Sequence, residues 1–414
     1  MPAPGPAQPV VLPVYQIPRP FYDPVGLNLG SFLLFPTASE QLGSDDNIFA
    51  SDRRRASDIV NTTNEALSMA SQWMRHSLTA HFLAGQELYA RHSSNNANIW
   101  SADFSGRADI TTDALFQLDG GFIQQPLPRG TPEAGDTSRR PLFNTTALTA
   151  AYVQRDMPLS DRLEFSLRDV AYISDSDASR SGTRFTYRDR VSYDLSPAVS
   201  LFVEGAFAQQ HWLRRADLRN FDLLTGLLGA DVDLPSTAHG EVGIGVLRQS
   251  FRDSDLETLV APTAHEELIW NVLPLTSILA TVDRTIIGTE TFCDSAASTC
   301  RSGSGSLLPG GPGLPPKRNS LQVTTAELGV QHEFFHDILG EASFRYERDH
   351  FDFNGLTDRL YALRANVRYL INRNLEADLD YTYRQRTANM SDDHTFNSGP
   401  YKENVVSIML KAGL

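Results

Sequence analysis

The sequence predicts an all-β protein, a closed antiparallel transmembrane β-barrel of about 18 strands with short periplasmic turns and long extracellular loops. Three observations lead to this prediction. Charged and apolar residues alternate over strand-length segments, short breaks recur at near-regular intervals, and longer polar stretches lie between the breaks. A barrel can also absorb all 414 residues as one domain.

The clearest alternation runs from residue 359 to residue 386, on both sides of a break at 371–374. One row is apolar and includes Leu363, Val367, Leu375 and Leu379, while the other row is charged. A two-residue period means β-strands with two different faces, which suit a sheet with lipid on one side and water on the other. The charged positions that we expect to line the pore are Glu341, Arg345, Glu347, Arg364, Arg368, Glu376, Asp378, Asp380 and Arg384.

These charges also predict contacts between strands. The break at residue 372 should bring Arg368 near one of the acids at 376 and 378, and Arg364 near Asp380 or Thr382. Opposite charges across a ladder contribute roughly 0.2–1 kcal/mol each. Such pairs either fill and hydrate the wall or form an ionic constriction that orients polar solutes such as sugars or uronic acids.

Eight short breaks separate the strand pairs, at residues 73–75, 111–113, 158–161, 195–197, 234–236, 272–274, 335–337 and 372–374. Most are about 38 residues apart, a repeat that fits one hairpin pair per unit. The longer intervals contain insertions at 124–140 and 292–316, and further long loops are predicted at 43–58 and 390–402. About nine long loops against eight short turns imply an even number of strands, so both termini should be periplasmic.

The two ends of the chain support a barrel in different ways. Residues 1–24 hold eight prolines, which favour extended chain, so we predict a periplasmic N-terminal arm followed by a barrel over residues 25–414. The first strand should begin at Gly26 and run towards Leu42. An apolar row ends at Leu414, which resembles an outer-membrane assembly signal, although the usual last residue is aromatic. No secretory signal is visible, so a barrel requires that the signal was removed or that the true start lies upstream.

Composition excludes several classes of protein. The net charge of −14 argues against nucleic acid as a partner, since a basic stripe would be expected. The mostly apolar stretch without charges at residues 268–282 is shorter than the roughly 20 apolar residues that a spanning helix needs, and no other uncharged stretch reaches that length. Cys293 and Cys300 share one Ser- and Gly-rich loop, where they form a disulfide in an oxidising compartment or stay as two free surface thiols. This loop and residues 124–140 are the candidates for folding inward and narrowing the pore.

Tyrosine and tryptophan fall mostly near the predicted strand ends. This placement suits an aromatic girdle at the membrane interfaces, with ordinary hairpin packing as the alternative. The residues concerned are Tyr361, Tyr369, Tyr381, Tyr383, Trp73, Trp100, Trp212 and Trp270.

One motif resembles a metal site. His332, Glu333 and His336 match the H-E-x-x-H pattern of zinc proteases. That site needs a helix, whereas the preceding residues alternate as a strand, in which residues four apart are separated by roughly 13 Å. We therefore expect a strand-end turn and no metal. No G-x-S-x-G elbow or phosphate-binding glycine loop occurs either, so we expect no catalytic residue, no cofactor and no enzyme activity.

Three local patterns resemble an outer-membrane β-barrel (porin-like) family of proteobacteria that is often linked to exopolysaccharide loci. They are DPVGL with GSFLLFP in residues 23–36, DDNIF at 45–49, and YLINRNL at 369–375 with Tyr381 and Arg384. The resemblance covers residues 21–414 and implies a membrane barrel, while it says little about the substrate.

The leading hypothesis is a channel in the outer membrane of a Gram-negative bacterium, for passive passage of small hydrophilic solutes or surface polysaccharide. The polysaccharide part is implied by the resemblance alone. One alternative is a structural or adhesive outer-membrane protein with a loop-plugged lumen, and another is a soluble β-repeat protein. Expected partners are outer-membrane lipid, the barrel assembly machinery and the solute or polysaccharide, while a homo-oligomer is left open.

Overall fold

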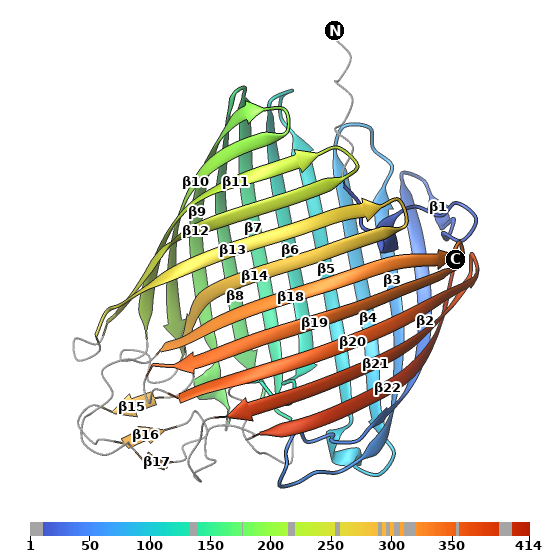
Figure 1. Ribbon diagram of the computed structural model, residues 1–414, viewed down its shortest axis with the longest axis vertical. Helices are drawn as coiled ribbons and strands as arrows, with labels where there is room; N and C mark the ends of the chain where they lie inside the picture. Colours follow the sequence, from blue (N-terminus) through green and yellow to red (C-terminus); the bar gives the residue numbers. More distant parts are fainter. Residues whose placement is uncertain are drawn as a thin grey trace.

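A single antiparallel β-sheet closes on itself to form a barrel (Figure 1), because β2 pairs with β3 on one side and with β22 on the other. The computed structural model describes residues 11–131, 140–175, 177–213, 220–252, 257–288, 292–294, 299–301, 307–309, 320–352, 356–388 and 400–414. Of the 19 strands in the sheet, the short β1 pairs only with β2, so 18 strands form the ring. The predicted fold class and strand number are confirmed.

Each strand of the ring pairs with its neighbours in sequence. The strands are β2 (Phe32–Asp45), β3 (Asp58–Ser71), β4 (Ser77–Tyr89), β5 (Ala97–Asp109), β6 (Ala114–Pro126), β7 (Leu142–Asp156), β8 (Leu159–Tyr172), β9 (Gly182–Ser196), β10 (Val199–Trp212), β11 (Phe221–Leu234), β12 (Ala238–Phe251), β13 (Leu259–Leu273), β14 (Thr276–Gly288), β18 (Ser320–Phe335), β19 (Ile338–Phe351), β20 (Leu356–Asn372), β21 (Leu375–Ala388) and β22 (Tyr401–Gly413).

The eight short turns fall at or within two residues of the predicted breaks. The break predicted at 158–161 is shifted, because β8 already begins at Leu159. The predicted first strand from Gly26 to Leu42 was wrong as one element, since the chain reverses between β1 (Leu27–Leu29) and β2. Gly30 has a φ of +63°, a left-handed conformation that glycine adopts without steric cost, and this permits the reversal.

The connections at the other end of the barrel are longer. Small elements outside the ring are the 3₁₀ turns η1 (Val14–Gln16), η2 (Ser93–Asn95) and η3 (Ala178–Arg180), and the strands β15 (Phe292–Asp294), β16 (Thr299–Arg301) and β17 (Leu307–Pro309). The last three form a separate sheet within the predicted loop 292–316, in which Cys293 lies opposite Cys300 in the backbone register. The cysteine side chains lie outside the described part of the structure, so the disulfide stays a prediction. No helix in the described ranges is long and apolar enough to span a membrane.

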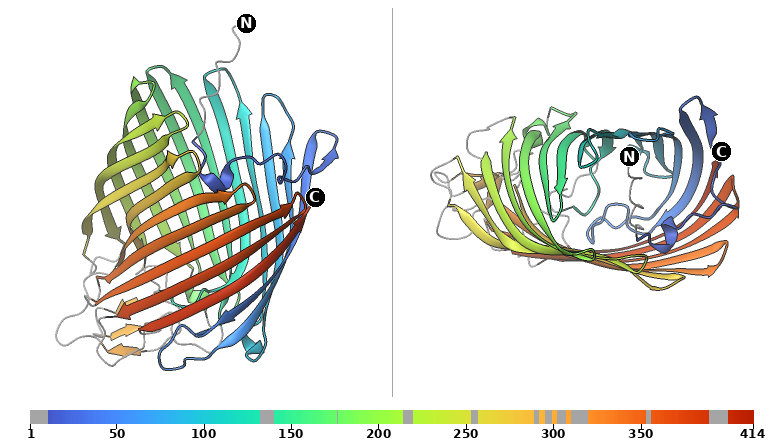
Figure 2. Two further views of the ribbon diagram at one scale, coloured as in Figure 1. Left: turned by 45° about the vertical axis from the view of Figure 1, so that its right-hand side comes forward. Right: turned by 90° about the horizontal axis from the view of Figure 1, so that it is seen from above.

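Strand register determines which residues share a face of the wall. Leu379 lies opposite Val367 and Ile408, and all three side chains are exposed on one face. Asp378 pairs with Arg368 on the other face, because neighbouring residues of a strand point to opposite sides. Seen from above, the strands form a ring, and the short blue turn η1 of the described N-terminal residues lies inside it (Figure 2). That segment contacts the face with Arg368, so the apolar face points outward.

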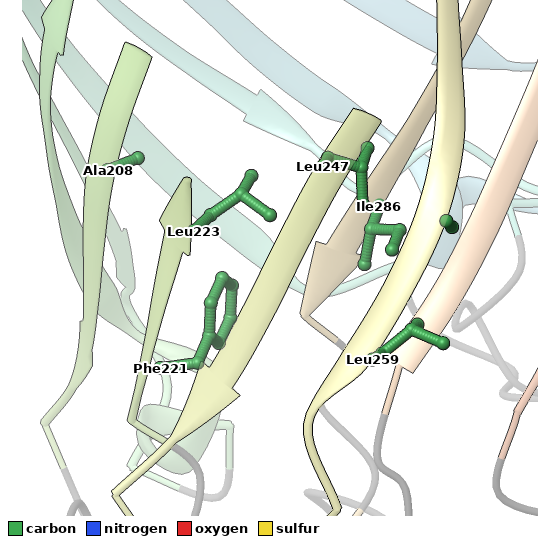
Figure 3. Packing of buried hydrophobic residues seen from close by; sticks show 7 residues of the cluster. Ala208, Phe221, Leu223, Leu247, Leu259 and Ile286 are labelled. Carbon is green, nitrogen blue, oxygen red and sulfur yellow. The ribbon is translucent and has the colours of Figure 1, made fainter. Parts of the chain in front are cut away.

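The inner face is not ionic throughout. Near the long-loop end Phe221, Leu223, Leu247 and Leu259 of β11–β13 form a buried apolar cluster with Ile286 of β14 (Figure 3). The pairing of β13 with β14 extends only from the turn to Ala264 and Arg284. Beyond Arg284 the end of β14 is therefore not paired with β13. The inner face of the wall therefore also has an apolar region, where the side chains pack against each other and exclude water.

The two faces of β18 provide a stability test. We expect Leu328→Lys to destabilise the barrel by about 2–4 kcal/mol, because it places a charge in hydrocarbon near mid-strand. Thr325→Lys is the matched control, since this residue faces the lumen between Asp283 and Glu347 and should be tolerated. Urea unfolding in lipid vesicles measures both. Equal losses of stability would contradict the assignment of the faces.

Candidate functional site

The predicted charged residues lie together on the inner face of β19, β20 and β21. Three pairs join neighbouring strands or neighbouring positions: Arg364 with Asp380 at 2.9 Å, Arg368 with Asp378 at 2.8 Å, and Arg345 with Glu347 at 2.7 Å. The first two are the pairs expected across the break at residue 372. The remaining members also have polar partners, with Glu376 to Lys411 at 2.9 Å, Arg384 to Glu403 at 3.0 Å, and Glu341 to Gln331 at 2.8 Å.

A second ionic wall covers the inner face of β8–β12. At its centre Arg190 contacts Asp231 and Glu241, each at 2.8 Å, and its guanidinium lies 3.6 Å from the centre of the Phe202 ring. Arg188 joins the same group through Glu204 at 3.2 Å. Charged side chains therefore line two parts of the ring that are distant in sequence.

The N-terminal arm is part of the site. Residues 11–23 do not extend away from the barrel but dock inside its short-turn end, where η1 contacts β14, β18 and β20. The backbone N–H of Val14 donates to Ser277 Oγ at 2.9 Å, and the Tyr15 hydroxyl donates to Asn366 Oδ1 at 2.7 Å. Arg19, which is 5% exposed, pairs with Glu333 at 2.9 Å.

Tyr15 is held over the ionic wall. The Arg368 guanidinium lies 5.2 Å from the centre of the Tyr15 ring. Burial raises the pKa of the Tyr15 phenol, which outweighs the opposite effect of the Arg368 cation. The phenol therefore stays neutral and acts as a hydrogen-bond donor to Asn366, so the arm is bound by polar as well as apolar contacts.

The loop between β6 and β7 narrows the opposite end. Its described part reaches across the opening, and the carbonyl oxygen of Gly130 accepts a hydrogen bond from Arg386 of β21. Gly130 has a φ of +75°, and a Cβ added to it would collide with the Tyr401 hydroxyl. A glycine is therefore required where the loop meets the wall. Of the insertion predicted at 124–140, residues 124–126 belong to β6 and residues 132–139 lie outside the described ranges, so inward folding of the whole insertion stays a prediction.

Arg386 itself is fully buried. It pairs with Asp349 at 2.9 Å and approaches Asp358 at 3.8 Å, and the two carboxylates are each 1% exposed. A buried charge is tolerated only when it is paired, so this cluster needs all its members.

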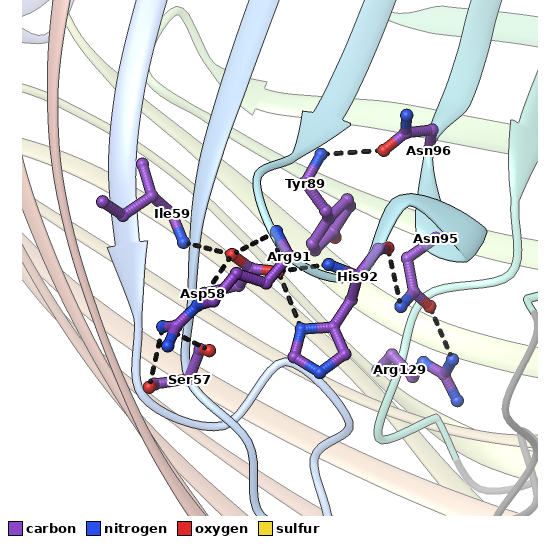
Figure 4. A network of polar contacts seen from close by, with 9 residues as sticks. All are labelled: Ser57, Asp58, Ile59, Tyr89, Arg91, His92, Asn95, Asn96 and Arg129. Carbon is purple, nitrogen blue, oxygen red and sulfur yellow. Dashed lines mark hydrogen bonds and ion pairs between the residues drawn. The ribbon is translucent and has the colours of Figure 1, made fainter.

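A polar network joins the loops at this end. The buried Asp58 carboxylate accepts hydrogen bonds from the backbone N–H groups of Ile59, Arg91 and His92 (Figure 4). Close to this carboxylate, Arg129 of the β6–β7 loop donates a hydrogen bond to Asn95 Oδ1 at 3.0 Å. The β2–β3, β4–β5 and β6–β7 loops are thereby tied into one rim.

The H-E-x-x-H motif lies at the end of β18, as predicted. His332 contacts Thr276 Oγ1 at 2.9 Å, whereas Glu333 binds Arg19 and lies 3.1 Å from His336. The two histidines thus have separate partners. Within the described ranges no group of three or more His, Cys, Asp or Glu side chains is arranged to hold a metal ion.

Sequence reasoning misplaced or missed some residues of the site. Trp212 was grouped with the interfacial aromatics, but it is 9% exposed and lies opposite Gly182 on the lumen side of β10. The docking of Tyr15 and Arg19 was not anticipated, because their partners lie more than 300 residues away. A Val-Tyr pair between prolines was the only local signal.

Two arginines on neighbouring strands, one buried and one exposed, test how much burial of an ion pair changes the free energy of unfolding. Arg386→Ala should cost about 3–5 kcal/mol, because it leaves Asp349 and Asp358 as buried charges without their cation. Arg364→Ala should cost less than about 1 kcal/mol, since its side chain is 55% exposed. Urea unfolding of both variants gives the comparison, and similar costs would show that the Arg386 cluster is not structural.

Comparison with known proteins agrees with the geometry. Residues 19–301 and 316–412 match the model of the family described as Putative beta-barrel porin 2. The comparison with curated proteins gave no match.

Several solved structures are similar to this chain at low sequence identity. The outer membrane protein OpdK from Pseudomonas aeruginosa is 10% identical over 92% of this chain and 99% of that chain, with a TM-score of 0.44. OccK2 (OpdF) from the same organism is 10% identical over 93% and 99%, with a TM-score of 0.48. The copper transporter OprC is 10% identical over 94% and 81%, also with a TM-score of 0.48. None of these likenesses bears on the solute.

The family match spans nearly the whole ring of strands, including both ionic walls. The chain therefore belongs to the Putative beta-barrel porin 2 family.

Proposed function

We propose that this protein is an outer-membrane channel for the passive passage of small hydrophilic solutes. The observation that supports it best is the closed ring of 18 strands with paired charges on its inner face and apolar side chains outside. Barrels of 16–18 strands are wide enough to hold an aqueous channel.

Surface polysaccharide as the transported material rests on the family resemblance alone. The ionic walls fit polar solutes in general, because paired cations and anions offer both donors and acceptors to hydroxyl-rich molecules. The described residues nearest the two chain ends, 11–23 and Leu414, lie on the short-turn side, so we propose that both termini are periplasmic in a Gram-negative cell. Insertion would then depend on the barrel assembly machinery.

The second candidate is a structural or adhesive protein with a plugged lumen. It is favoured by the docked arm at one end and by the Gly130 loop at the other. Planar-bilayer recording of the purified protein separates the two functions. Stepwise ion conductance supports the channel, whereas the absence of any current from inserted protein would remove it in favour of the plugged barrel.

The arm provides a sharper test of the channel. Arg19→Ala breaks the pair with Glu333 and leaves that carboxylate without its cation, a loss of about 3–5 kcal/mol that is comparable to what the remaining hydrogen bonds of the arm supply together. We expect the arm to leave the lumen and the single-channel conductance to rise. Arg53→Ala, in an exposed position of the β2–β3 loop, is the control and should conduct like the wild type. Equal conductance of all three proteins would show that the arm does not narrow the pore.

A homo-oligomer is supported by the outer face of β2–β4. Register places Glu40, Thr63 and Asn61 on the same side as Leu410 and Ile408, away from the lumen. Glu40 accepts hydrogen bonds of 2.7 Å from both Asn61 and Thr63, close to mid-strand. A carboxylate in hydrocarbon is costly, and the amide and hydroxyl groups of a second copy could replace the missing water.

Disulfide crosslinking tests this interface. In a variant with serine at both native cysteines, Thr63→Cys should give a covalent dimer in membranes, while Ile408→Cys on β22 should give much less. Equal or absent crosslinking at both positions would contradict the proposed contact.

A further inference from the structure

An arginine pair without a carboxylate lies on the inner face of β8 and β9. Arg168 and Arg184 are directly opposite each other in the register. Like charges in this position destabilise a sheet, so the arrangement needs a reason. Within the described part of the chain neither residue forms an ion pair with Asp or Glu, and the one hydrogen bond of Arg184 goes to the neutral Gln210 at 3.1 Å. The Arg184 guanidinium also lies 5.7 Å from the centre of the Phe221 ring.

The rest of the ionic wall shows the contrast. Arg188 and Arg190, only four and six residues further along β9, each contact carboxylates. On the opposite wall Arg364, Arg368 and Arg384 do the same. The nearest acid on the inner face of β8 is Glu164, one strand position beyond Ser166, and it is already bound to Arg162 at 3.0 Å. The other arginines named here thus have carboxylate partners, whereas Arg168 and Arg184 do not.

A cavity lies against this pair. It has a volume of about 190 Å³ and is lined by Arg168, Arg180 and Arg184, by Gln210, and by Val170, Trp212 and Ile287. No carboxylate is among these lining residues. The volume is below the roughly 300–1,000 Å³ of pockets for drug-sized ligands, so only a small molecule fits.

The two kinds of lining residue suggest the chemistry of the ligand. Guanidinium groups bind planar carboxylates through two parallel hydrogen bonds. Val170, Trp212 and Ile287 offer an apolar surface, which suits the hydrocarbon part of an organic acid better than a phosphate ion. Arg168 lies on the inner face and its side chain is exposed, so a solute in the lumen can reach it.

We propose that the cavity between β8, β9 and β10 is a binding site for a small organic carboxylate, with Arg168 and Arg184 as its cationic contacts. The binding itself does not depend on whether the barrel conducts. We also expect the site to favour anions during transport, and this second expectation rests on the proposed channel function.

Binding is measured on the detergent-solubilised full chain with butyrate as the probe, by the broadening of its NMR signals. We expect saturable binding, and at least about tenfold weaker binding for the double variant Arg168→Gln/Arg184→Gln, because charged hydrogen bonds are lost. Arg248→Gln is the control: it makes the same kind of substitution once, on the outward face of β12 opposite Leu224 and Val260, and should bind butyrate like the wild type. Inorganic phosphate should bind more weakly than butyrate.

The same variants separate a binding role from a structural one. Removing two like charges should leave the unfolding midpoint unchanged or raised, whereas loss of a structural pair would lower it. Non-saturable butyrate binding, or equal binding by the double variant, overturns the site. Phosphate binding as tight as butyrate overturns the assignment to a carboxylate.

Bilayer recording then keeps the two proposals distinct. Current without butyrate binding would overturn this site and leave the channel intact. Butyrate binding without current would remove the channel and leave the binding site.

Discussion

Backbone hydrogen bonding in a medium without water is the constraint on which the whole structure depends. In hydrocarbon each unpaired N–H or C=O costs several kcal/mol, so a membrane-spanning sheet cannot have a free edge. The pairing of β22 with β2 satisfies that requirement, from Thr37 opposite Gly413 to Asp45 opposite Val405. The first and last long strands of the chain must therefore meet. Everything else follows from a ring with two unlike faces, in which apolar residues face lipid and the interior is left to polar groups.

The interior is filled in three different ways. Ion pairs such as Arg190 with Asp231 and Glu241 cover part of the inner face with polar groups and connect neighbouring strands. The arm docks at one end, and the Gly130 loop contacts the wall at the other. An apolar cluster around Phe221 and Ile286 closes part of the long-loop side. A solute would thus meet a neutralised wall for most of its path, and local departures from neutrality determine which charge is favoured.

How much could be predicted from the sequence depends on the range of the interactions. The strands, their number, the short turns and the pairs of Arg364 and Arg368 follow from alternation and hairpin spacing, because they involve residues close in sequence. The split at Gly30 was missed, since only Gly30 and Ser31 separate the apolar residues of β1 from the apolar run at the start of β2. The contacts of Tyr15 and of Gly130 join residues about 250 to 350 positions apart, and no local pattern encodes them.

The lumen site shows the same limit. Strand periodicity places Arg168 and Arg184 on an inner row, but only the register shows that they oppose each other without an acid. Likewise, periodicity alone could not place Trp212 in the lumen, because an aromatic residue near a strand end suits either face. The charge of single residues is visible in sequence, whereas the balance of charge around a point requires the closed ring.

The most direct test of the account is the accessibility of single cysteines along β21, at each position from 375 to 384 in a variant with serine at both native cysteines. The protein is embedded in vesicles and treated with a charged, water-soluble thiol reagent. The account predicts reaction at the even positions, which face the lumen, and protection at the odd positions, which face lipid. Uniform reaction along the strand, or the opposite alternation, would contradict a closed barrel with an aqueous interior.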